Sequence, residues 1–514
     1  MRTTRRTLPM AFLLVCLIVL PACVAGPVAV LGETGPPPPG WAGPLPQVQV
    51  LVVDDEGNPV ADAAVRFDGT APVVTGSDGL AAVDWPGRPV EVSARGPGLR
   101  PASAQIESLI EEPLQVTLEP VVLNGRAVTE DGEPLSGVEV TLGEQEAVTD
   151  DAGRFTLRRA SKGEITASMP AWEQARVPWD GRSKRITVEM SPLMVRGLHV
   201  AGWLPANEEV WPSLLDLVER TELNALVVDI KDESGSVFHA SEVEVATRAG
   251  ALKPEYDITE LASELHERDL YLVGRIVAFQ DPIAARAISA MAIRDTATHG
   301  PFNKNGQWFL DPTDDQAQQY ALDLAMEACR SGFDEIQFDY VRFPDGYPVT
   351  ARFDEGADES ARVETITTFL ETAEQQLNEI GCAVAADIFG FIISIENDGG
   401  IGQRLEELSQ AVDVVSPMVY PSHYSTGWFQ KDCPNDHPHD TVAGALDDGL
   451  PRLPATAVLR PWIQDFDGSY ACGSTGKTVT QVQSQIEAAT ERGLGYMVWN
   501  AASSFTEDAF RLDE

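Results

Sequence analysis

From about residue 195 to the C-terminus, short apolar segments alternate with longer amphipathic ones. One short segment, Phe333–Asp339, begins after Gly332 and carries apolar side chains among polar neighbours, as in a barrel strand. An order of strand then helix implies a parallel sheet. We expect eight strands, at Gly197–Trp203, Ala225–Ile230, Leu270–Val277, Phe333–Asp339, Ala383–Asp387, Val412–Tyr420, Ala457–Gln464 and Leu494–Asn500. Residues 195–514 are therefore predicted to form an α/β fold, a (β/α)₈ TIM barrel with its active site at the C-terminal strand ends.

The N-terminus is predicted to be a targeting segment. Three arginines precede the apolar run Leu8–Leu20, which is too short to span a membrane, so residues 1–22 are expected to be a signal peptide. The run leads into Leu20-Pro21-Ala22-Cys23, which resembles a bacterial lipobox and implies lipidation of Cys23, although proline is unusual there. Residues 23–46 are rich in proline and glycine and are expected to form an extended linker. We expect an exported protein of the cell envelope, lipid-anchored to a membrane, with plain secretion as the alternative.

Two sequence repeats separate this linker from the barrel, at residues 47–120 and 121–194. Each contains an acidic turn, a proline and an alternating strand, and a second turn follows 20 residues after Pro59 and 19 residues after Pro134. This pattern predicts two small β-sandwich domains. They resemble the carboxypeptidase-regulatory-like sandwiches found beside many exported bacterial enzymes, which implies a spacing or weak binding role.

Two of the six cysteines lie in the N-terminal segment, and the other four bear on disulfides. Cys433 and Cys472 lie in loops rich in glycine, proline and aspartate. We expect a disulfide between them, because exported proteins keep disulfides. Cys329 and Cys382 are expected to be ordinary buried thiols in a helix and a strand.

The charge balance disfavours a nucleic-acid partner. The chain has 37 Lys and Arg against 79 Asp and Glu, a net charge of −42, and such a surface repels polyanions. The two histidines of Asp436-His437-Pro438-His439-Asp440 match no zinc-binding spacing. The sequence has no glycine loop suited to phosphate, so no cofactor and no metal are expected, and no protein partner is predicted.

Polar residues end several expected strands and should meet at one end of the barrel: Asp229, Asp339, Asp387, Asp465 and Asn500. Carboxylates among aromatic rings suit glycoside hydrolysis, in which one acid protonates the leaving oxygen and a second carboxylate attacks carbon or activates water. The rings stack on the apolar faces of sugars. The expected substrate-binding residues are Asp229, Lys231, Arg275, Arg342, Tyr420, His423, Trp462, Asp465, Trp499 and Asn500.

Seven stretches of the barrel together resemble a bacterial family of glycoside hydrolase-like barrels, catalogued as a domain of unknown function. They are Ala225–Asp232, Gly274–Val277, Asp334–Pro344, Ala386–Gly390, Ser416–Tyr424, Arg460–Phe466 and Trp499–Ala501. The resemblance implies a glycosidase-type TIM barrel without naming a substrate.

The fourth strand departs from the pattern of chitinase-like barrels, which place a glutamate two residues after the last aspartate. That position is Val341 here, and the middle acidic position is Gln337, so substrate-assisted chitinase chemistry is not expected. Barrels of the α-galactosidase and α-amylase kind instead end this strand in an aspartate nucleophile. By this fold-level analogy Asp339 is predicted to be the nucleophile or base.

Asp387 is predicted to be the general acid, with Phe389 raising its pKa by desolvation. Asp465 is the rival acid. The simpler interpretation of Asp339 is a buried ion pair with Arg342 or Arg275 that only orders the site.

Asp229 and Lys231 are expected to form an ion pair at the barrel mouth, with a binding role or a structural one. The predicted protein is a glycoside hydrolase acting on a polysaccharide or oligosaccharide. The alternatives are a carbohydrate-binding barrel without catalysis and an envelope protein whose sandwiches do the binding.

Overall fold

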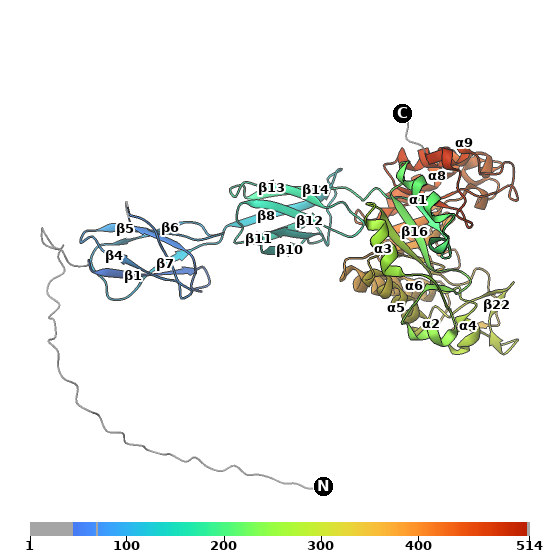
Figure 1. The fold of residues 1–514 in the computed structure, drawn as a ribbon, viewed down its shortest axis with the longest axis horizontal. Coiled ribbons are helices and arrows are strands. Elements are labelled where there is room, and N and C mark those ends of the chain that lie inside the picture. The colour runs from blue at the N-terminus through green and yellow to red at the C-terminus, as the bar shows by residue number, and fades with distance from the viewer. Residues whose placement is uncertain (1–44, 68–69, 511–514) are drawn as a thin grey trace, which may run out of the picture. The chain divides into compact units, whose positions relative to one another are not determined.

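The computed structural model describes residues 45–67 and 70–510. The predicted signal peptide and the lipidation site at Cys23 lie outside these residues. The chain divides into two compact units between Pro120 and Val121; the first contains one β-domain, and the second contains another β-domain and the barrel (Figure 1). Within the described ranges, no helix is both long enough and apolar enough to cross a bilayer.

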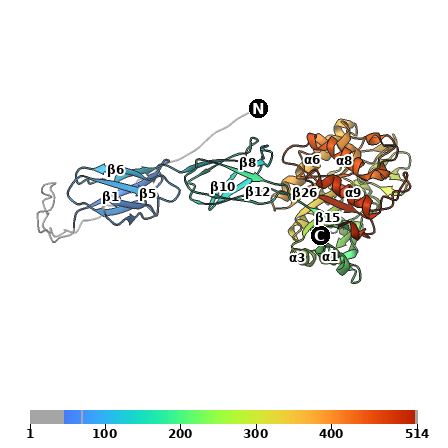
Figure 2. The same ribbon diagram turned by 90° about the horizontal axis from the view of Figure 1, so that it is seen from above.

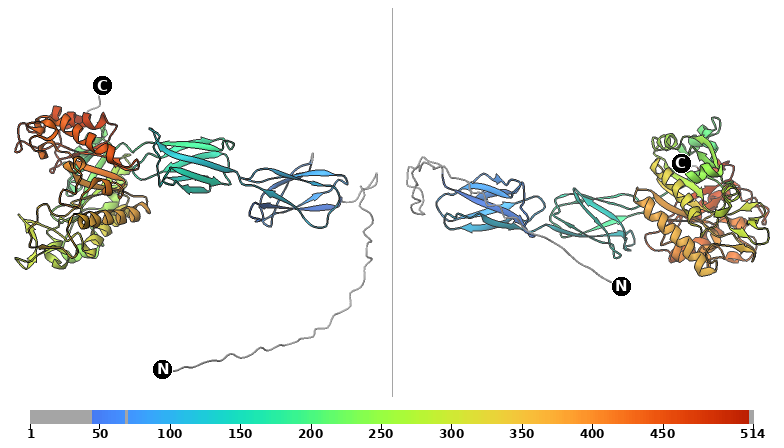
Figure 3. Two further views of the ribbon diagram at one scale, coloured as in Figure 1. Left: turned by 180° about the vertical axis from the view of Figure 1, so that it is seen from behind. Right: turned by 90° about the horizontal axis from the view of Figure 1, so that it is seen from below.

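The two β-domains share one topology, and Figure 3 shows both as strands without helices. Each has a three-stranded sheet whose central strand pairs once antiparallel and once parallel, and a four-stranded antiparallel sheet. The first domain has the orders β4-β1-β7 and β3-β2-β5-β6, formed by β1 (Gln47–Asp54), β2 (Ala64–Phe67), β3 (Val73–Val74), β4 (Leu80–Asp84), β5 (Val90–Arg95), β6 (Ala102–Ile106) and β7 (Leu114–Leu118). The second has the orders β11-β8-β14 and β10-β9-β12-β13, formed by β8 (Val122–Thr129), β9 (Glu139–Leu142), β10 (Gln145–Val148), β11 (Arg154–Arg158), β12 (Gly163–Ser168), β13 (Ala175–Trp179) and β14 (Arg185–Met190). The predicted pair of β-sandwiches is confirmed.

A buried threonine occupies the same place in both sandwiches. The Thr75 hydroxyl donates to the carbonyl oxygen of Val60 at 2.7 Å, and the Thr149 hydroxyl donates to that of Leu135 at 2.6 Å. A buried hydroxyl without a partner would be destabilising. In each domain this bond therefore ties the threonine to a residue 14 or 15 positions earlier in the chain. The sequence repeat is therefore a structural repeat.

The barrel is closed by parallel strands. β15 (Arg196–Val200) pairs with both β16 (Ala225–Lys231) and β30 (Tyr496–Trp499). Between them lie β19 (Tyr271–Val277), β24 (Glu335–Asp339), β26 (Ala383–Phe389), β27 (Val414–Met418), β28 (Val458–Leu459) and β29 (Trp462–Gln464). The predicted eight-stranded TIM barrel is confirmed.

Helices lie outside these strands in the views of Figures 1 and 2. They are α1 (Trp211–Glu219), α3 (Ile258–His266), α5 (Asp315–Arg330), α6 (Glu359–Asn378), α7 (Leu405–Leu408), α8 (Pro438–Gly449) and α9 (Val479–Thr490). Asp257, Asp314 and Asp358 accept backbone N–H groups at the starts of α3, α5 and α6, which satisfies donors that a helix start leaves free. The strand-to-helix loops also contain β17 (Val237–His239), α2 (Glu244–Ala249), β18 (Leu252–Tyr256), α4 (Ala284–Ala287), β20 (Arg294–Asp295), β21 (Gly300–Pro301), β22 (Asn303–Lys304), β23 (Gln307–Trp308) and β25 (Ala351–Arg352).

All eight predicted strands are present, but their ends shift by up to three residues and one strand is divided. The seventh, expected at Ala457–Gln464, is divided into β28 and β29 around Pro461, because proline lacks the N–H that a central strand donates. The first ends at Val200 rather than Trp203, and a short 3₁₀ turn at Leu204–Ala206 follows.

The prediction that Cys329 and Cys382 are free thiols is wrong. They form a disulfide, with their Cα atoms 5.9 Å apart. Cys329 lies in the last turn of α5 and Cys382 directly precedes β26, so the packing of helix against strand brings together residues 53 positions apart. The predicted loop disulfide, Cys433–Cys472, is present.

Replacing both Cys329 and Cys382 by serine is expected to lower the free energy of unfolding by about 4 kcal/mol. A bond that closes a loop of this length restricts the unfolded chain more than the folded one. Denaturant unfolding of the variant and the parent measures the difference. A difference below about 1 kcal/mol would show that the bond adds little to the packing of α5.

Candidate active site

A cavity of about 550 Å³ lies at the C-terminal ends of the barrel strands. Six barrel strands each contribute a side chain to its lining: Arg275, Asp339, Asp387, Met418, Trp462 and Trp499. A parallel barrel brings the ends of all its strands to one face, so residues far apart in the sequence meet here.

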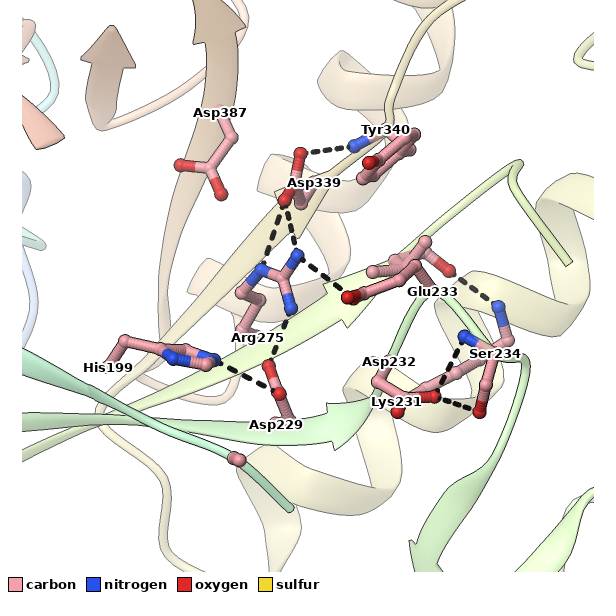
Figure 4. Close-up of polar contacts among 12 residues, drawn as sticks. His199, Asp229, Lys231, Asp232, Glu233, Ser234, Arg275, Asp339, Tyr340 and Asp387 are labelled. Atoms are coloured by element: carbon pink, nitrogen blue, oxygen red, sulfur yellow. Dashed lines mark hydrogen bonds and ion pairs between the residues drawn. The ribbon is translucent and has the colours of Figure 1, made fainter. Parts of the chain in front are cut away.

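Asp339 is the last residue of β24, and both of its carboxylate oxygens accept hydrogen bonds (Figure 4). Its Oδ2 accepts hydrogen bonds from Nε and Nη2 of Arg275 at 3.0 and 2.6 Å, and its Oδ1 accepts the backbone N–H of Tyr340 at 2.6 Å. Tyr340 has a φ of +49°, a left-handed conformation that costs a non-glycine residue about 1–3 kcal/mol. The strained backbone places this N–H against the carboxylate and fixes the direction of Asp339.

Arg275 is the cation at the centre of the site (Figure 4). Besides contacting Asp339, it donates from Nη1 to Oδ1 of Asp229 at 2.6 Å and lies 3.6 Å from Oε2 of Glu233. Its guanidinium carbon lies 4.7 Å from the centre of the Trp499 ring. Burial alone would lower the pKa of Arg275, but the surrounding carboxylates raise it well above its usual value, so Arg275 stays charged and orients three acidic groups.

Asp387, in β26, lies beside Asp339 (Figure 4). Its Oδ1 accepts the indole N–H of Trp462 at 2.6 Å, whereas its buried Oδ2 has no hydrogen-bond partner among the described residues. Burial raises the pKa of Asp387 well above its usual value, and the nearby Asp339 carboxylate adds to the increase. Burial and the neighbouring carboxylate therefore both favour the protonated form of Asp387.

The expected ion pair between Asp229 and Lys231 is wrong. Lys231 pairs with Asp281 at 3.0 Å and donates to the carbonyl of Val277 at 2.6 Å, whereas Asp229 pairs with Arg275 and lies 3.1 Å from Nε2 of His199. Residues two apart in a regular strand point to the same face. The strand register shifts between Asp229 and Lys231, and such a bulge turns their side chains in different directions. Both are buried, so neither lies at an open mouth.

His199 and Arg275 also change the pKa of Asp229. Burial alone would raise its pKa, but His199 and Arg275 hold it below its usual value. Asp229 is thus a charged support of Arg275 and does not line the cavity.

Arg342 is not the partner of Asp339. It donates to the carbonyl of Phe343 at 3.1 Å, lies 3.6 Å from Asp345, and stacks over the Phe389 ring at 4.5 Å. Burial lowers the pKa of Arg342. Its side chain lines the cavity, so a contact with substrate stays a prediction.

Asp465 and Asn500 are buried but do not line the cavity. Asp465 accepts the backbone N–H and the hydroxyl of Thr506 at 2.6 and 2.7 Å, and Asn500 donates to the carbonyls of Asp465 and Ser504. The two strand ends therefore hold the C-terminal segment, and the predicted substrate contacts of Asp465 and Asn500 stay predictions.

The other predicted binding residues, Tyr420, His423, Trp462 and Trp499, all line the cavity. Tyr420 and His423 meet edge to face with ring centres 5.1 Å apart, and Trp462 and Trp499 do so at 5.6 Å. Burial lowers the pKa of His423. An uncharged imidazole and several ring faces suit a sugar better than a charged ligand.

Sequence reasoning missed Glu233, His199 and Tyr470. Glu233 and Tyr470 lie on loops and line the cavity. His199 contacts Asp229 and does not line the cavity. Glu233 directly follows the recognised stretch Ala225–Asp232, so its position after β16 was the available signal. In the part of the chain that the structure describes, no group of three or more His, Cys, Asp or Glu side chains could hold a metal ion.

A model of the family described as "Putative glycosyl hydrolase domain" matches residues 197–505, which is more than half of the chain. The chain belongs to this glycosyl hydrolase family. The match spans β16 to β30 and every strand end that lines the cavity. The protein is thus assigned to the glycoside hydrolases by sequence.

Several solved structures are similar to this glycosyl hydrolase. A hypothetical protein from Ruminiclostridium thermocellum is 34% identical, covering 37% of this chain and 96% of its own, with a TM-score of 0.34. The PgaB (BpsB) glycoside hydrolase domain from Bordetella bronchiseptica is 13% identical, covering 62% and 100%, with a TM-score of 0.45. The spore cortex-lytic enzyme SleL of Bacillus cereus is 13% identical, covering 61% and 73%, with a TM-score of 0.37. No curated protein matches the sequence.

Proposed function

We propose that the barrel hydrolyses O-glycosidic bonds of a polysaccharide, with Asp387 as general acid and Asp339 as nucleophile or base. One observation carries this assignment: Asp387, with its raised pKa and one oxygen free of partners, lines the same cavity as Asp339. Glycoside hydrolysis needs one carboxyl group that donates a proton and a second that attacks carbon or activates water.

The hydrogen bonds of Asp387 indicate where its proton lies. Oδ1 accepts the N–H of Trp462, so the proton belongs on Oδ2, which has no partner in the described structure. From Oδ2 it passes to the glycosidic oxygen while the bond from that oxygen to the anomeric carbon breaks. The indole N–H then stabilises the negative charge left on Asp387.

Asp339 acts at the anomeric carbon, where positive charge develops as the leaving group departs. As nucleophile it attacks this carbon, and water, deprotonated by Asp387, then hydrolyses the glycosyl-enzyme intermediate. As base it instead accepts a proton from a water molecule that attacks the same carbon. Arg275 and the N–H of Tyr340 hold both oxygens of Asp339 in a fixed direction. This preorganisation removes the cost of orienting the group during reaction.

The aromatic lining supports a carbohydrate substrate. Trp462, Trp499 and Tyr420 line the cavity beside the two carboxyl groups, and of these Trp499 is only partly buried. Aromatic rings pack against the C–H faces of sugars. These side chains suit the cavity to a sugar substrate.

We also propose that the protein is exported and lipid-anchored through Cys23. The basic and apolar N-terminal segment supports export, and so do the two disulfides, which persist in oxidising compartments. In this arrangement the β-sandwiches are spacers. Replacing Cys23 by serine in the native host should move the protein from the membrane fraction to the soluble fraction, and an unchanged distribution would contradict the anchor.

Release of reducing ends from a panel of bacterial and plant polysaccharides tests the proposed activity. The wild type should release them from at least one polysaccharide, and Asp339→Asn should not. No release from any member, with equal binding of a polysaccharide by both proteins, would identify the barrel as a carbohydrate-binding domain without catalysis.

A further inference from the structure

We propose that Tyr470 forms an outer sugar-binding subsite, which the Cys433–Cys472 disulfide holds at the rim of the cavity. This inference rests on the proposed glycosidase function and extends it: the substrate is a chain that continues beyond the sugars at Asp339 and Asp387.

Tyr470 differs from the other aromatic residues of the cavity in its exposure. It lines the cavity, yet 69% of its surface is accessible to solvent, whereas Trp462 is 1% exposed. Single exposed apolar side chains are common on protein surfaces, but Tyr470 also lines the cavity, so its exposed ring is available to a ligand bound there. Because a sugar has one apolar face, a solvent-exposed tyrosine ring at the rim suits a further sugar unit.

Hydrogen bonds from Asn435 and a disulfide fix the loop that carries Tyr470. The buried side-chain amide of Asn435 donates to the carbonyls of Gly468, Cys472 and Ser474, at 3.4, 3.2 and 2.6 Å. The disulfide joins the same loop to Cys433, two residues before Asn435. The ring of Tyr470 is thus presented on an ordered support, which lowers the entropy lost when a ligand binds.

Close packing brings this loop against the wall of the cavity. A Cβ at Gly468 would lie 2.5 Å from Cβ of Ser422 and 2.6 Å from Nε2 of Gln464, so only glycine permits the approach. The hydroxyl of Tyr470 lies 3.4 Å from that of Ser422, which also lines the cavity. The outer subsite is therefore continuous with the catalytic cavity.

The test compares two substrates of the same sugar: the polysaccharide cleaved in the panel and the corresponding 4-nitrophenyl glycoside. Tyr470→Ala should lower kcat/KM about three- to tenfold on the polysaccharide, the loss expected from one aromatic stacking contact, and much less on the aryl glycoside. Tyr470→Phe, which keeps the ring, should retain most of the activity on both.

Val349→Ala is the matched control, because Val349 is 92% exposed and does not line the cavity. It should leave both activities unchanged. The double variant Cys433→Ser/Cys472→Ser should, like Tyr470→Ala, lower kcat/KM more on the polysaccharide than on the aryl glycoside. Equal losses on both substrates, or none on either, would overturn the outer subsite.

The same variants separate this inference from the proposed function. If the wild type cleaves no polysaccharide, its migration is measured in native gels that contain each polysaccharide of the panel. Retardation that Tyr470→Ala loses and Tyr470→Phe keeps would support the subsite without hydrolysis. Equal retardation of all variants, or none in any gel, would overturn it.

Discussion

Replacing Asp339 by asparagine is expected to lower the rate of polysaccharide hydrolysis by about 10⁴-fold or more. The amide has the size of the carboxyl group but neither attacks carbon nor accepts a proton. The fold should persist, because Arg275 keeps its contacts with Asp229 and Glu233. Reducing-end release gives the rate, and circular dichroism with thermal unfolding confirms the fold.

Asp465→Asn is the matched control for this substitution. Asp465 is also a buried aspartate at a strand end, but it binds Thr506 and does not line the cavity. Its asparagine variant should retain most of the activity. If Asp339→Asn kept a tenth of the wild-type rate, Asp339 would only order the site; if Asp465→Asn were inactive while folded, Asp465 would again be a candidate acid.

Asp387→Asn is expected to slow hydrolysis of the polysaccharide by about 10²–10⁴-fold, the usual contribution of a general acid. Its activity on a 2,4-dinitrophenyl glycoside should stay close to that of the wild type, because this leaving group departs without a proton. Measuring kcat/KM on both substrates separates the loss of the acid from a general loss of structure.

Glu233→Gln provides the comparison within the same cavity. Glu233 is the third carboxylate of the lining, but it lies on a loop and contacts Arg275. Should the dinitrophenyl substrate rescue Glu233→Gln instead of Asp387→Asn, Glu233 would be the general acid. Equal losses of Asp387→Asn on both substrates would exclude proton donation by Asp387.

The alternation of strands and helices was enough to predict the barrel, because a parallel sheet with crossover helices has few closed arrangements. The same pattern placed Asp339 and Asp387 at strand ends and predicted their meeting. It also offered Arg275 as one of two partners for Asp339, although only the structure could decide between Arg275 and Arg342.

The remaining features depend on details that periodicity does not contain. A single bulge turns Lys231 away from Asp229. The Cys329–Cys382 bond depends on how α5 packs against the sheet. Glu233 and Tyr470 reach the cavity from loops, and loop conformation is set by local hydrogen bonds rather than by a repeating pattern.

The pH dependence of kcat/KM tests the proposed role of Asp387 as general acid most directly. Asp387 donates only while protonated, and its pKa is raised, so activity should persist above the ordinary carboxyl range and fall as the pH rises through this raised value. On a 2,4-dinitrophenyl glycoside, Asp387→Asn should show no such alkaline decrease. A wild-type decrease at the ordinary carboxyl pKa, or an alkaline decrease that survives in Asp387→Asn, would contradict Asp387 as the general acid.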